Sequence, residues 1–311
     1  MNRPRELPRF QDPFDLHAQL GVGGTSTVYL ATTRSGIVRP DALLAVKVVE
    51  RQESPLSHRA AFREWKIGRR ISHEGLPHYV QFLRGESRPT MVAMDYVPGV
   101  NMETLLDRGS LPIPMACEVM MRVCDALTYL HELADEEGPF NAVHGDIKPG
   151  NLMITPDGHV VLMDLGVARY RGEENFFKPG TTVGTPPYMS PEQAQGHLLD
   201  ARSDLFSLAS VFFTFVTGQN PFEDEIVARS NAEAQQRVTR ILLRIAQCEC
   251  TRWMRQAMLD SLGEVGEIIS TCHCFDPEGR VQTARELRAR IAAARRALSP
   301  LGRPLNPSGA P

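Results

Sequence analysis

The chain has 311 residues, of which 42% are hydrophobic and 23% charged, a composition near the globular average that excludes wholesale disorder. Its length suggests two lobes or domains, or one large single unit, with a core that needs no disulfide or metal ion. Its net charge of -3 gives no chain-wide reason to expect nucleic acid as a partner. Because no run approaches the roughly 18 apolar residues of a membrane span and the first residues lack a signal-peptide core, we expect a cytoplasmic protein without a membrane anchor.

After a leader at residues 1–13, the first third of the chain predicts mostly strands. Runs of β-branched and apolar residues separated by glycine and proline indicate the strands, whereas Phe62, Trp65 and Ile67 follow the spacing of a helix with one apolar side. The expected elements are strands at 16–20, 27–31 and 43–49, a helix at 57–71, and two strands within 78–97 with a turn at 85–89.

Beyond Pro98 and Gly99, helical spacing predominates. A helix at 114–133, buried on one face, is predicted by apolar residues at three- and four-residue steps: Met115, Val119, Val123, Leu127 and Leu130. Further elements are expected as strands at 151–155 and 159–163 and as helices at 204–217, 228–247, 252–270 and 283–297. This order predicts an α+β fold of two lobes, with a β-rich N-terminal lobe at 14–97, a mainly helical C-terminal lobe at 98–293, and a Pro/Gly-rich tail at 294–311.

Four of the six cysteines form two close pairs, Cys248 with Cys250 and Cys272 with Cys274, and His273 lies inside the second pair. Such a group suits zinc, but the C-x-C spacing differs from the usual C-x-x-C knuckle. The spacing favours buried helical thiols instead, and metal binding by these cysteines stays open.

Two segments of the predicted strands carry candidate phosphate-binding chemistry. Glycines within Gly21–Val28 let backbone amides approach phosphate oxygens, although an ordinary hairpin turn would also explain them. Lys47 lies in an otherwise apolar strand, where a buried and unpaired ammonium would be costly. We expect Glu64, on the following helix, to pair with Lys47 and hold it against nucleotide phosphates.

Residues 143–154 form the strongest candidate. Asp146 and Asn151 lie five residues apart, and Asp164 follows thirteen residues later. Two carboxylates and an amide suit Mg²⁺ bridging a polyphosphate, and one carboxylate can instead accept a hydroxyl proton. Lys148 could neutralise charge on a transferring phosphoryl group. Asp and Asn are common in turns, which would explain any one of Asp146, Asn151 and Asp164. Turn formation does not explain why all three occur at these spacings.

Taken together, these segments resemble the eukaryotic-type protein kinases, specifically their bacterial serine/threonine branch. Residues 21–28 resemble the glycine-rich loop, and A-V-K-V at 45–48 resembles V-A-I-K. Residues 144–151 match H-R-D-L-x-x-x-N except at Gly145, and D-L-G at 164–166 stands for D-F-G.

The resemblance extends through the second half of the chain and covers about residues 14–293. Residues 184–192 resemble the substrate-docking loop that runs into A-P-E. Asp204 resembles the aspartate that braces the catalytic loop, and Arg280 the arginine that pairs with the A-P-E glutamate, here Glu192.

The resemblance implies transfer of the ATP γ-phosphoryl group to Ser or Thr hydroxyls of proteins, with Mg²⁺ or Mn²⁺ as the metal. It makes Asp146 the catalytic base, Lys148 its neighbouring cation, and Lys47, oriented by Glu64, the phosphate ligand, with Asn151 and Asp164 binding the metal. The implied ATP-binding residues are Leu20, Gly21, Val22, Gly23, Gly24, Thr25, Ser26, Val28, Ala45, Lys47, Met94 as gatekeeper, Asp95 and Val97 in the hinge with Tyr96, and Met153. The implied activation segment contains Thr181, Thr182, Thr185 and Glu192, and the implied structural residues are His144, Asp204 and Arg280.

Three residues depart from the family pattern. Gly145 replaces the arginine that pairs with a phosphorylated activation loop, which puts loop-phosphate activation in doubt rather than catalysis. Ser26 replaces the third glycine of the loop, a mild change. Gly68, four residues after Glu64, stands where many kinases have a larger packing residue, so we expect a mobile helix that a regulatory partner protein would seat.

Two other functions compete with this interpretation. Aminoglycoside and choline kinases share H-G-D-x-x-x-x-N and phosphorylate small molecules, but they normally lack an activation segment like that at 184–192. A nucleotide-binding pseudokinase scaffold is the other alternative, and the retained Lys47, Asp146, Asn151 and Asp164 argue against it.

Overall fold

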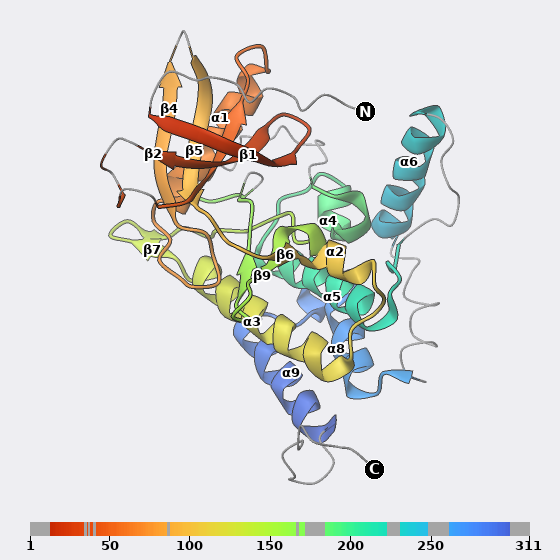
Figure 1. The fold of residues 1–311 in the computed structure, drawn as a ribbon. Helices are drawn as coiled ribbons and strands as arrows, with labels where there is room; N and C mark the ends of the chain where they lie inside the picture. The colour runs from red at the N-terminus through yellow and green to blue at the C-terminus, as the bar shows by residue number, and fades with distance from the viewer. Residues whose placement is uncertain are drawn as a thin grey trace. The chain divides into compact units, whose positions relative to one another are not determined.

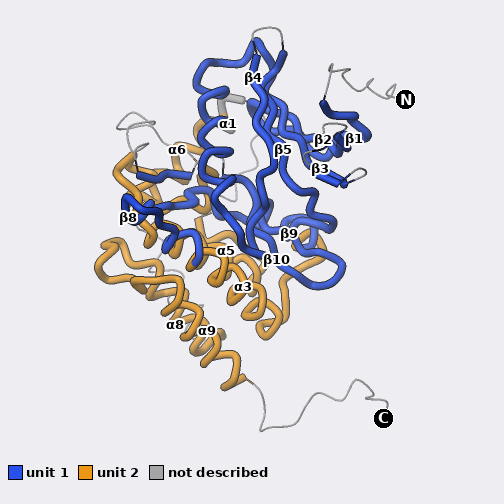
Figure 2. The backbone as a smooth tube through the Cα atoms, turned by 90° about the vertical axis from the view of Figure 1, so that its left-hand side faces the viewer, with its two compact units in different colours: residues 1–105, 129–178 blue, residues 106–128, 179–311 orange. Residues whose placement is uncertain are grey.

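The computed structural model describes residues 13–33, 36, 38–39, 42–85, 88–165, 168–171, 184–222, 231–247 and 261–298. The chain divides into two compact units, residues 1–105 with 129–178 and residues 106–128 with 179–311 (Figure 2). Each unit contains its own cluster of buried apolar side chains. The lobe limits drawn from the sequence stay a prediction.

The first unit contains the expected five-stranded sheet, which is antiparallel throughout with the order β1-β2-β3-β5-β4. Strands β1, β2 and β3 pair in sequence, and α1 follows β3. The chain then forms β4 at the edge of the sheet and returns as β5, which pairs with both β3 and β4. The elements are β1 (Phe14–Val22), β2 (Thr27–Thr33), β3 (Leu44–Val49), α1 (Pro55–Gly68), β4 (Tyr79–Gly85) and β5 (Arg88–Asp95) (Figure 1).

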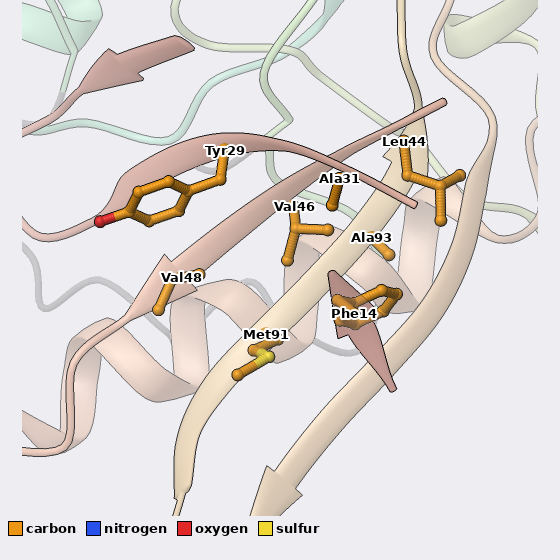
Figure 3. Close-up of a cluster of buried hydrophobic side chains, with 8 residues drawn as sticks. All are labelled: Phe14, Tyr29, Ala31, Leu44, Val46, Val48, Met91 and Ala93. Carbon is orange, nitrogen blue, oxygen red and sulfur yellow. The ribbon is translucent and has the colours of Figure 1, made fainter. Parts of the chain in front are cut away.

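The two faces of this sheet differ in what they carry. Strand residues alternate between faces, so directly paired residues share a face. One face gathers buried apolar side chains from four strands: Phe14, Tyr29, Ala31, Leu44, Val46, Val48, Met91 and Ala93 (Figure 3). The alternate residues, including Lys47, therefore lie on the opposite face.

Helix α1 packs against β4 and β5 (Figure 1). It begins after Ser54, whose hydroxyl accepts a hydrogen bond from the Ser57 amide at 3.2 Å, and Pro55 occupies its first turn. Of the three residues predicted for its apolar side, Ile67 is fully buried. Phe62 is 41% exposed, and it packs with Trp65 and with Phe82 of β4 at ring-centroid distances of 5.2–5.9 Å.

The buried face of α1 instead carries two charged residues. Arg63 is 3% exposed and Glu64 is 1% exposed. The Arg63 Nη2 donates to the Ala168 carbonyl at 2.9 Å, its guanidinium lies 5.8 Å from the Tyr170 ring centroid, and the Tyr170 hydroxyl donates to the Arg63 carbonyl at 3.3 Å. Arg63 is therefore buried among partners, Ala168 and Tyr170, that lie more than a hundred residues away in the sequence. The spacing of apolar residues cannot predict such partners.

The rest of the first unit carries the catalytic-type segments on short elements. Strands β9 (Leu152–Ile154) and β10 (Val160–Leu162) lie within the predicted strands, and β6 (Val100–Asn101) adds a third strand that the sequence did not predict. Helix α2 (Met102–Leu106) and the hairpin of β7 (Ala134–Asp135) and β8 (Gly138–Pro139) were also not predicted. Gly99, at φ 144°, is needed because a Cβ there would overlap the Ile154 carbonyl oxygen.

The second unit is helical, as expected. Its helices are most of α3 (Ile113–His131), α4 (Pro191–Ala194), α5 (Ala201–Thr217), α6 (Asn231–Gln247), α8 (Glu264–Cys272) and α9 (Ala284–Leu298). The stripe predicted for α3 is buried except at Met115, which is 46% exposed. Residues 252–260 of one predicted helix lie outside the described residues, and no helix among those described has the length and apolarity to cross a bilayer.

Candidate active site

Lys47 is the centre of a charged network in the first unit. Its Nζ lies 2.8 Å from Glu64 Oε2 on α1 and 2.9 Å from Asp164 Oδ1, residues 17 and 117 positions away in the sequence. Burial alone would lower the pKa of Lys47, but the charges of Asp164 and Glu64 outweigh burial and raise it well above its usual value. The ammonium therefore stays charged, and the Lys47–Glu64 pairing expected from the sequence is present.

The register of the sheet explains which predicted nucleotide-binding residues accompany Lys47. Val28 pairs directly with Lys47, and Ala45, two residues before it on the same strand, pairs with Met94. These four side chains therefore share the face opposite the apolar cluster. Ala45 and Met94 are each 5% exposed, and Val28 is half-buried.

The glycine-rich turn joins β1 to β2. Gly21 pairs with Val28 and Val22 with Thr27, and the Gly23 amide donates to the Ser26 carbonyl at 2.8 Å, so Ser26 is compatible with a tight turn. A Cβ at Gly21 or Gly24 would meet no atom within 4 Å, and at Gly23 nothing nearer than 3.5 Å. Among the described residues, neither a close neighbour nor a positive φ requires glycine at positions 21, 23 and 24. The open space beside these glycines is consistent with a ligand that binds against the turn.

The remaining loop and hinge residues are mostly exposed. Leu20 is 43% and Val22 68% exposed, and Thr25 is exposed as well. In the hinge, the Asp95 amide donates to the His78 carbonyl at 3.0 Å and the Tyr96 amide to the Leu43 carbonyl at 3.2 Å. Of these three hinge residues, Val97 is the one whose amide has no partner among the described residues.

The catalytic-type loop is organised around the buried His144. Its Nδ1 accepts from the Asp146 amide at 3.3 Å, so its Nε2 carries the proton and donates to the Met163 carbonyl at 3.1 Å. Gly145 adopts φ 77°, a conformation that residues with a Cβ rarely adopt. The Asp146 carboxylate reaches Lys148 Nζ at 2.9 Å, and its side chain is 12% exposed.

Asn151 and Asp164 are the predicted metal ligands. The Asn151 Nδ2 donates to the Asp146 carbonyl at 2.8 Å and to Asp146 Oδ2 at 3.2 Å, which turns its amide oxygen away from Asp146. The Met163 amide donates to the Asn151 carbonyl at 2.7 Å, and this bond brings Asp164, at φ 65° and with its side chain 46% exposed, next to Asn151 along the backbone. One carboxylate and one amide oxygen form a hard donor set that fits Mg²⁺ or Mn²⁺. Met153 follows on β9 and is half-buried.

A second ionic site lies within the second unit. Arg280 Nη1 and Nη2 each donate to one oxygen of Glu192 at 2.8 Å, and the Ser203 hydroxyl donates to the same carboxylate at 2.6 Å. Burial alone would raise the pKa of Glu192, but the bonds and charge of Arg280 outweigh it and lower the pKa below its usual value. The predicted pairing of Arg280 with Glu192 is therefore present.

The structure describes two of the four other residues predicted for the activation segment and its support. Thr185 is half-buried and precedes a short 3₁₀ turn at Pro186–Tyr188, and Asp204 is fully buried in the first turn of α5. Thr181 and Thr182 lie outside the described residues.

Of the two cysteine pairs, the structure describes Cys272 with Cys274. Cys248 and Cys250 also lie outside the described residues. Cys272 is buried and free, His273 bonds Ser210 Oγ at 2.9 Å, and no metal-binding group of three or more such side chains occurs in the described segments.

Two residues in or beside the Lys47 network could not be predicted from the sequence. Tyr79, at the start of β4, donates from its hydroxyl to Glu64 Oε1 at 2.8 Å, and Arg63 holds the segment that follows D-L-G. The only sequence signal was the small residue at Gly68, which indicated empty space but not what fills it.

Comparison with known proteins agrees with this geometry. A family profile described as "Protein kinase domain" matches residues 14–290. The chain is 31% identical over 222 residues to a probable serine/threonine-protein kinase PknB of Corynebacterium glutamicum, covering 69% of this chain and 33% of that protein. It is 28% identical over 298 residues to the serine/threonine-protein kinase PknB of Mycolicibacterium smegmatis, covering 93% of this chain and 43% of that protein.

These alignments span less than half the length of each relative, whereas the profile covers most of this chain. The α+β architecture, with a β-rich N-terminal lobe and a mainly helical C-terminal lobe, is the one predicted for that profile's family. The chain therefore belongs to the protein kinase domain family.

Proposed function

We propose that this chain is a serine/threonine protein kinase, which transfers the γ-phosphoryl group of ATP to Ser or Thr hydroxyl groups of proteins. The observation that carries the proposal is the network of Lys47 with Glu64 and Asp164, three residues from distant parts of the sequence. The family match and the names of the similar proteins support the same activity.

Lys47 would bind the α- and β-phosphates of ATP as a fixed positive charge. Its two carboxylate partners keep it protonated and hold it in one position, so little reorganisation is needed when phosphate oxygens approach. The amides of the glycine turn would contact the phosphates from the other side, where the space beside Gly21 and Gly24 is open. The purine would lie against Val28, Ala45, Met94 and Met153, with its edge bonded to the Val97 amide.

Asp146 would act as the general base. The acceptor hydroxyl oxygen attacks the γ-phosphorus in line, the bond from that phosphorus to the β–γ bridging oxygen breaks, and the hydroxyl proton passes to the Asp146 carboxylate. Lys148, 2.9 Å from that carboxylate, would stabilise charge on the phosphoryl oxygens. Lys148 and Thr185 follow the Ser/Thr rather than the Tyr pattern of the family.

Asn151 and Asp164 would hold the metal, with Mg²⁺ preferred and Mn²⁺ as a substitute. When bound, the ion neutralises negative charge on the polyphosphate. Asn151 would bind the ion through its amide oxygen, because its nitrogen is bonded to Asp146. Asp164, whose side chain is 46% exposed and bonded to Lys47 through Oδ1, would bind it through its carboxylate.

The proposal is tested with radiolabelled ATP, generic protein substrates and small alcohols. We expect label on Ser or Thr of the protein and none on the alcohols; label on the alcohols alone would favour a small-molecule kinase. Asp146→Ala should abolish transfer while leaving the thermal melting curve unchanged. Wild-type rates from that variant would overturn the role of Asp146, and nucleotide binding without transfer by the wild type would favour a scaffold.

A further inference from the structure

The space at Gly68 is filled by another part of the chain. Gly68 is the last residue of α1, and a Cβ built on it would overlap the ring of Tyr79, the first residue of β4. Tyr79 is 3% exposed. The small residue that predicted a loosely packed helix therefore makes room for an aromatic ring, and the ring can occupy this position only because residue 68 has no side chain.

The hydroxyl of Tyr79 reaches the catalytic-type network. It donates to Glu64 Oε1 at 2.8 Å, while the other oxygen of the same carboxylate accepts from Lys47 Nζ at 2.8 Å. With both oxygens bonded, the carboxylate cannot rotate without losing a bond on one side or the other.

The same hydroxyl also meets the segment that carries Asp164. The Leu165 backbone also acts on this hydroxyl: it opposes the rise of the Tyr79 pKa, which is caused first by burial and then by the charges of Glu64 and Asp164. Leu165 is 1% exposed and directly follows Asp164. One phenol therefore bonds α1 from β4 and lies near the residue after the predicted metal ligand.

We propose that Tyr79 is a positioning residue, which acts through Glu64 to hold Lys47 and α1 in the arrangement suited to phosphoryl transfer. This inference rests on the proposed kinase function. It replaces the expectation of a mobile helix, because the contacts that fix α1 on this side are supplied within the chain itself.

Packing alone does not account for a tyrosine at this position. A phenylalanine would fill the space beside Gly68 equally well and would not place a polar hydroxyl in the interior. A buried hydroxyl is tolerated when it is bonded, and here its proton is donated to the Glu64 carboxylate of the network. The hydroxyl is thus the part of the side chain to remove in a test.

Tyr79→Phe removes the hydroxyl and keeps the ring, so the fold should survive. Tyr29→Phe is the matched control, because Tyr29 is a buried tyrosine of the same sheet on the opposite, apolar face. Gly68→Ala is an independent route, because its Cβ would displace the Tyr79 ring even though alanine favours helices. All three are compared with wild type well below their melting temperatures.

The first measurement is hydrogen exchange of the amides of residues 56–68 in α1, which does not depend on activity. We expect exchange to be about tenfold faster in Tyr79→Phe and Gly68→Ala and unchanged in Tyr29→Phe. Wild-type exchange in Tyr79→Phe would overturn the proposal.

The second measurement is kcat/KM for Mg-ATP with a protein substrate, in Tyr79→Phe, Glu64→Gln and the double variant. We expect Tyr79→Phe to lower kcat/KM about tenfold, and the double variant to be no worse than Glu64→Gln, because Tyr79 acts through that carboxylate. If the two effects multiply, the role is merely structural and the proposal fails. If the wild type transfers no phosphate at all, the proposed function fails, while the exchange experiment still decides whether Tyr79 holds α1.

Discussion

Breaking the ion pair between Arg280 and Glu192 by removing one partner should strongly destabilise the second unit. Arg280 is 4% exposed and donates from Nη1 and Nη2 to the two oxygens of Glu192. Its remaining bonds go to the backbone carbonyls of Cys274 at 2.8 Å, Phe275 at 2.9 Å and Arg202 at 3.3 Å. Arg280→Met keeps the apolar stem of the side chain and removes every one of these bonds.

The cost of this change follows from what is left behind. Glu192 would keep the Ser203 hydroxyl but lose its countercharge, with its side chain only 12% exposed. Removing one member of a buried pair costs about 3–5 kcal/mol, because the other charge stays buried. At about 2–4 °C per kcal/mol for a domain of this size, the melting temperature should fall by roughly 6–20 °C.

Thermal melts of four variants test the reasoning: Arg280→Met, Glu192→Gln, the double variant of these two, and Arg202→Met. Arg280→Met with Glu192→Gln should recover part of the loss, because no uncompensated charge remains, with a coupling energy of about 1–3 kcal/mol. Arg202→Met is the control, since Arg202 pairs with the exposed carboxylates of Asp200 and Glu278 and should cost less than about 1 kcal/mol. If Arg280→Met costs no more than Arg202→Met, or if the double variant is simply additive, the pair does not stabilise this unit as argued.

Three further predictions concern pH, the backbone and the activation segment. The pKa of Glu192 is lowered in the folded state, so ionised Glu192 stabilises the fold fully above its unfolded pKa near 4.5, and this stabilisation is lost as pH falls through the folded pKa. The difference in the free energy of unfolding between wild type and Glu192→Gln, measured by urea unfolding, should therefore shrink below about pH 4.5. Gly145→Ala should destabilise by about 1 kcal/mol in the same assay, because φ 77° is costly for a residue with a Cβ, and an unchanged midpoint would contradict this. Thr181→Ala with Thr182→Ala should keep most kinase activity, since Gly145 cannot bind a loop phosphate, and a loss above about tenfold would refute that.

Much of the architecture could be predicted because it depends on local patterns. Runs of β-branched and apolar residues between glycine and proline breaks located β1 to β5, and the three- and four-residue steps located α3 to within two residues of each end. The pairing of Lys47 with Glu64 could also be anticipated, because an ammonium in an apolar strand requires an anion nearby. Such inferences need only the neighbourhood of each residue.

What could not be predicted depends on distant partners. Helical spacing identified Phe62, Trp65 and Ile67 as an inward side. Of these only Ile67 is buried, whereas the charged Arg63 and Glu64 are buried as well. Their burial is compensated by Ala168, Tyr170 and Lys47, and the Ala168 and Tyr170 contacts cross more than a hundred residues. The two-residue strands β6, β7 and β8 are too short to show any period at all.

The two glycines that depart most from the family pattern have different physical explanations. At Gly145 the reason is conformational, since φ 77° suits a residue without a Cβ. At Gly68 the reason is spatial, because the Tyr79 ring occupies the volume of a side chain and its hydroxyl serves Glu64. The missing side chain at Gly68 is thus offset by a contact from Tyr79 to the Lys47 network. We therefore expect the Lys47 network to keep its arrangement in this chain alone. The doubt that Gly145 raises about activation by a loop phosphate stays a prediction, which the variants at Thr181 and Thr182 test.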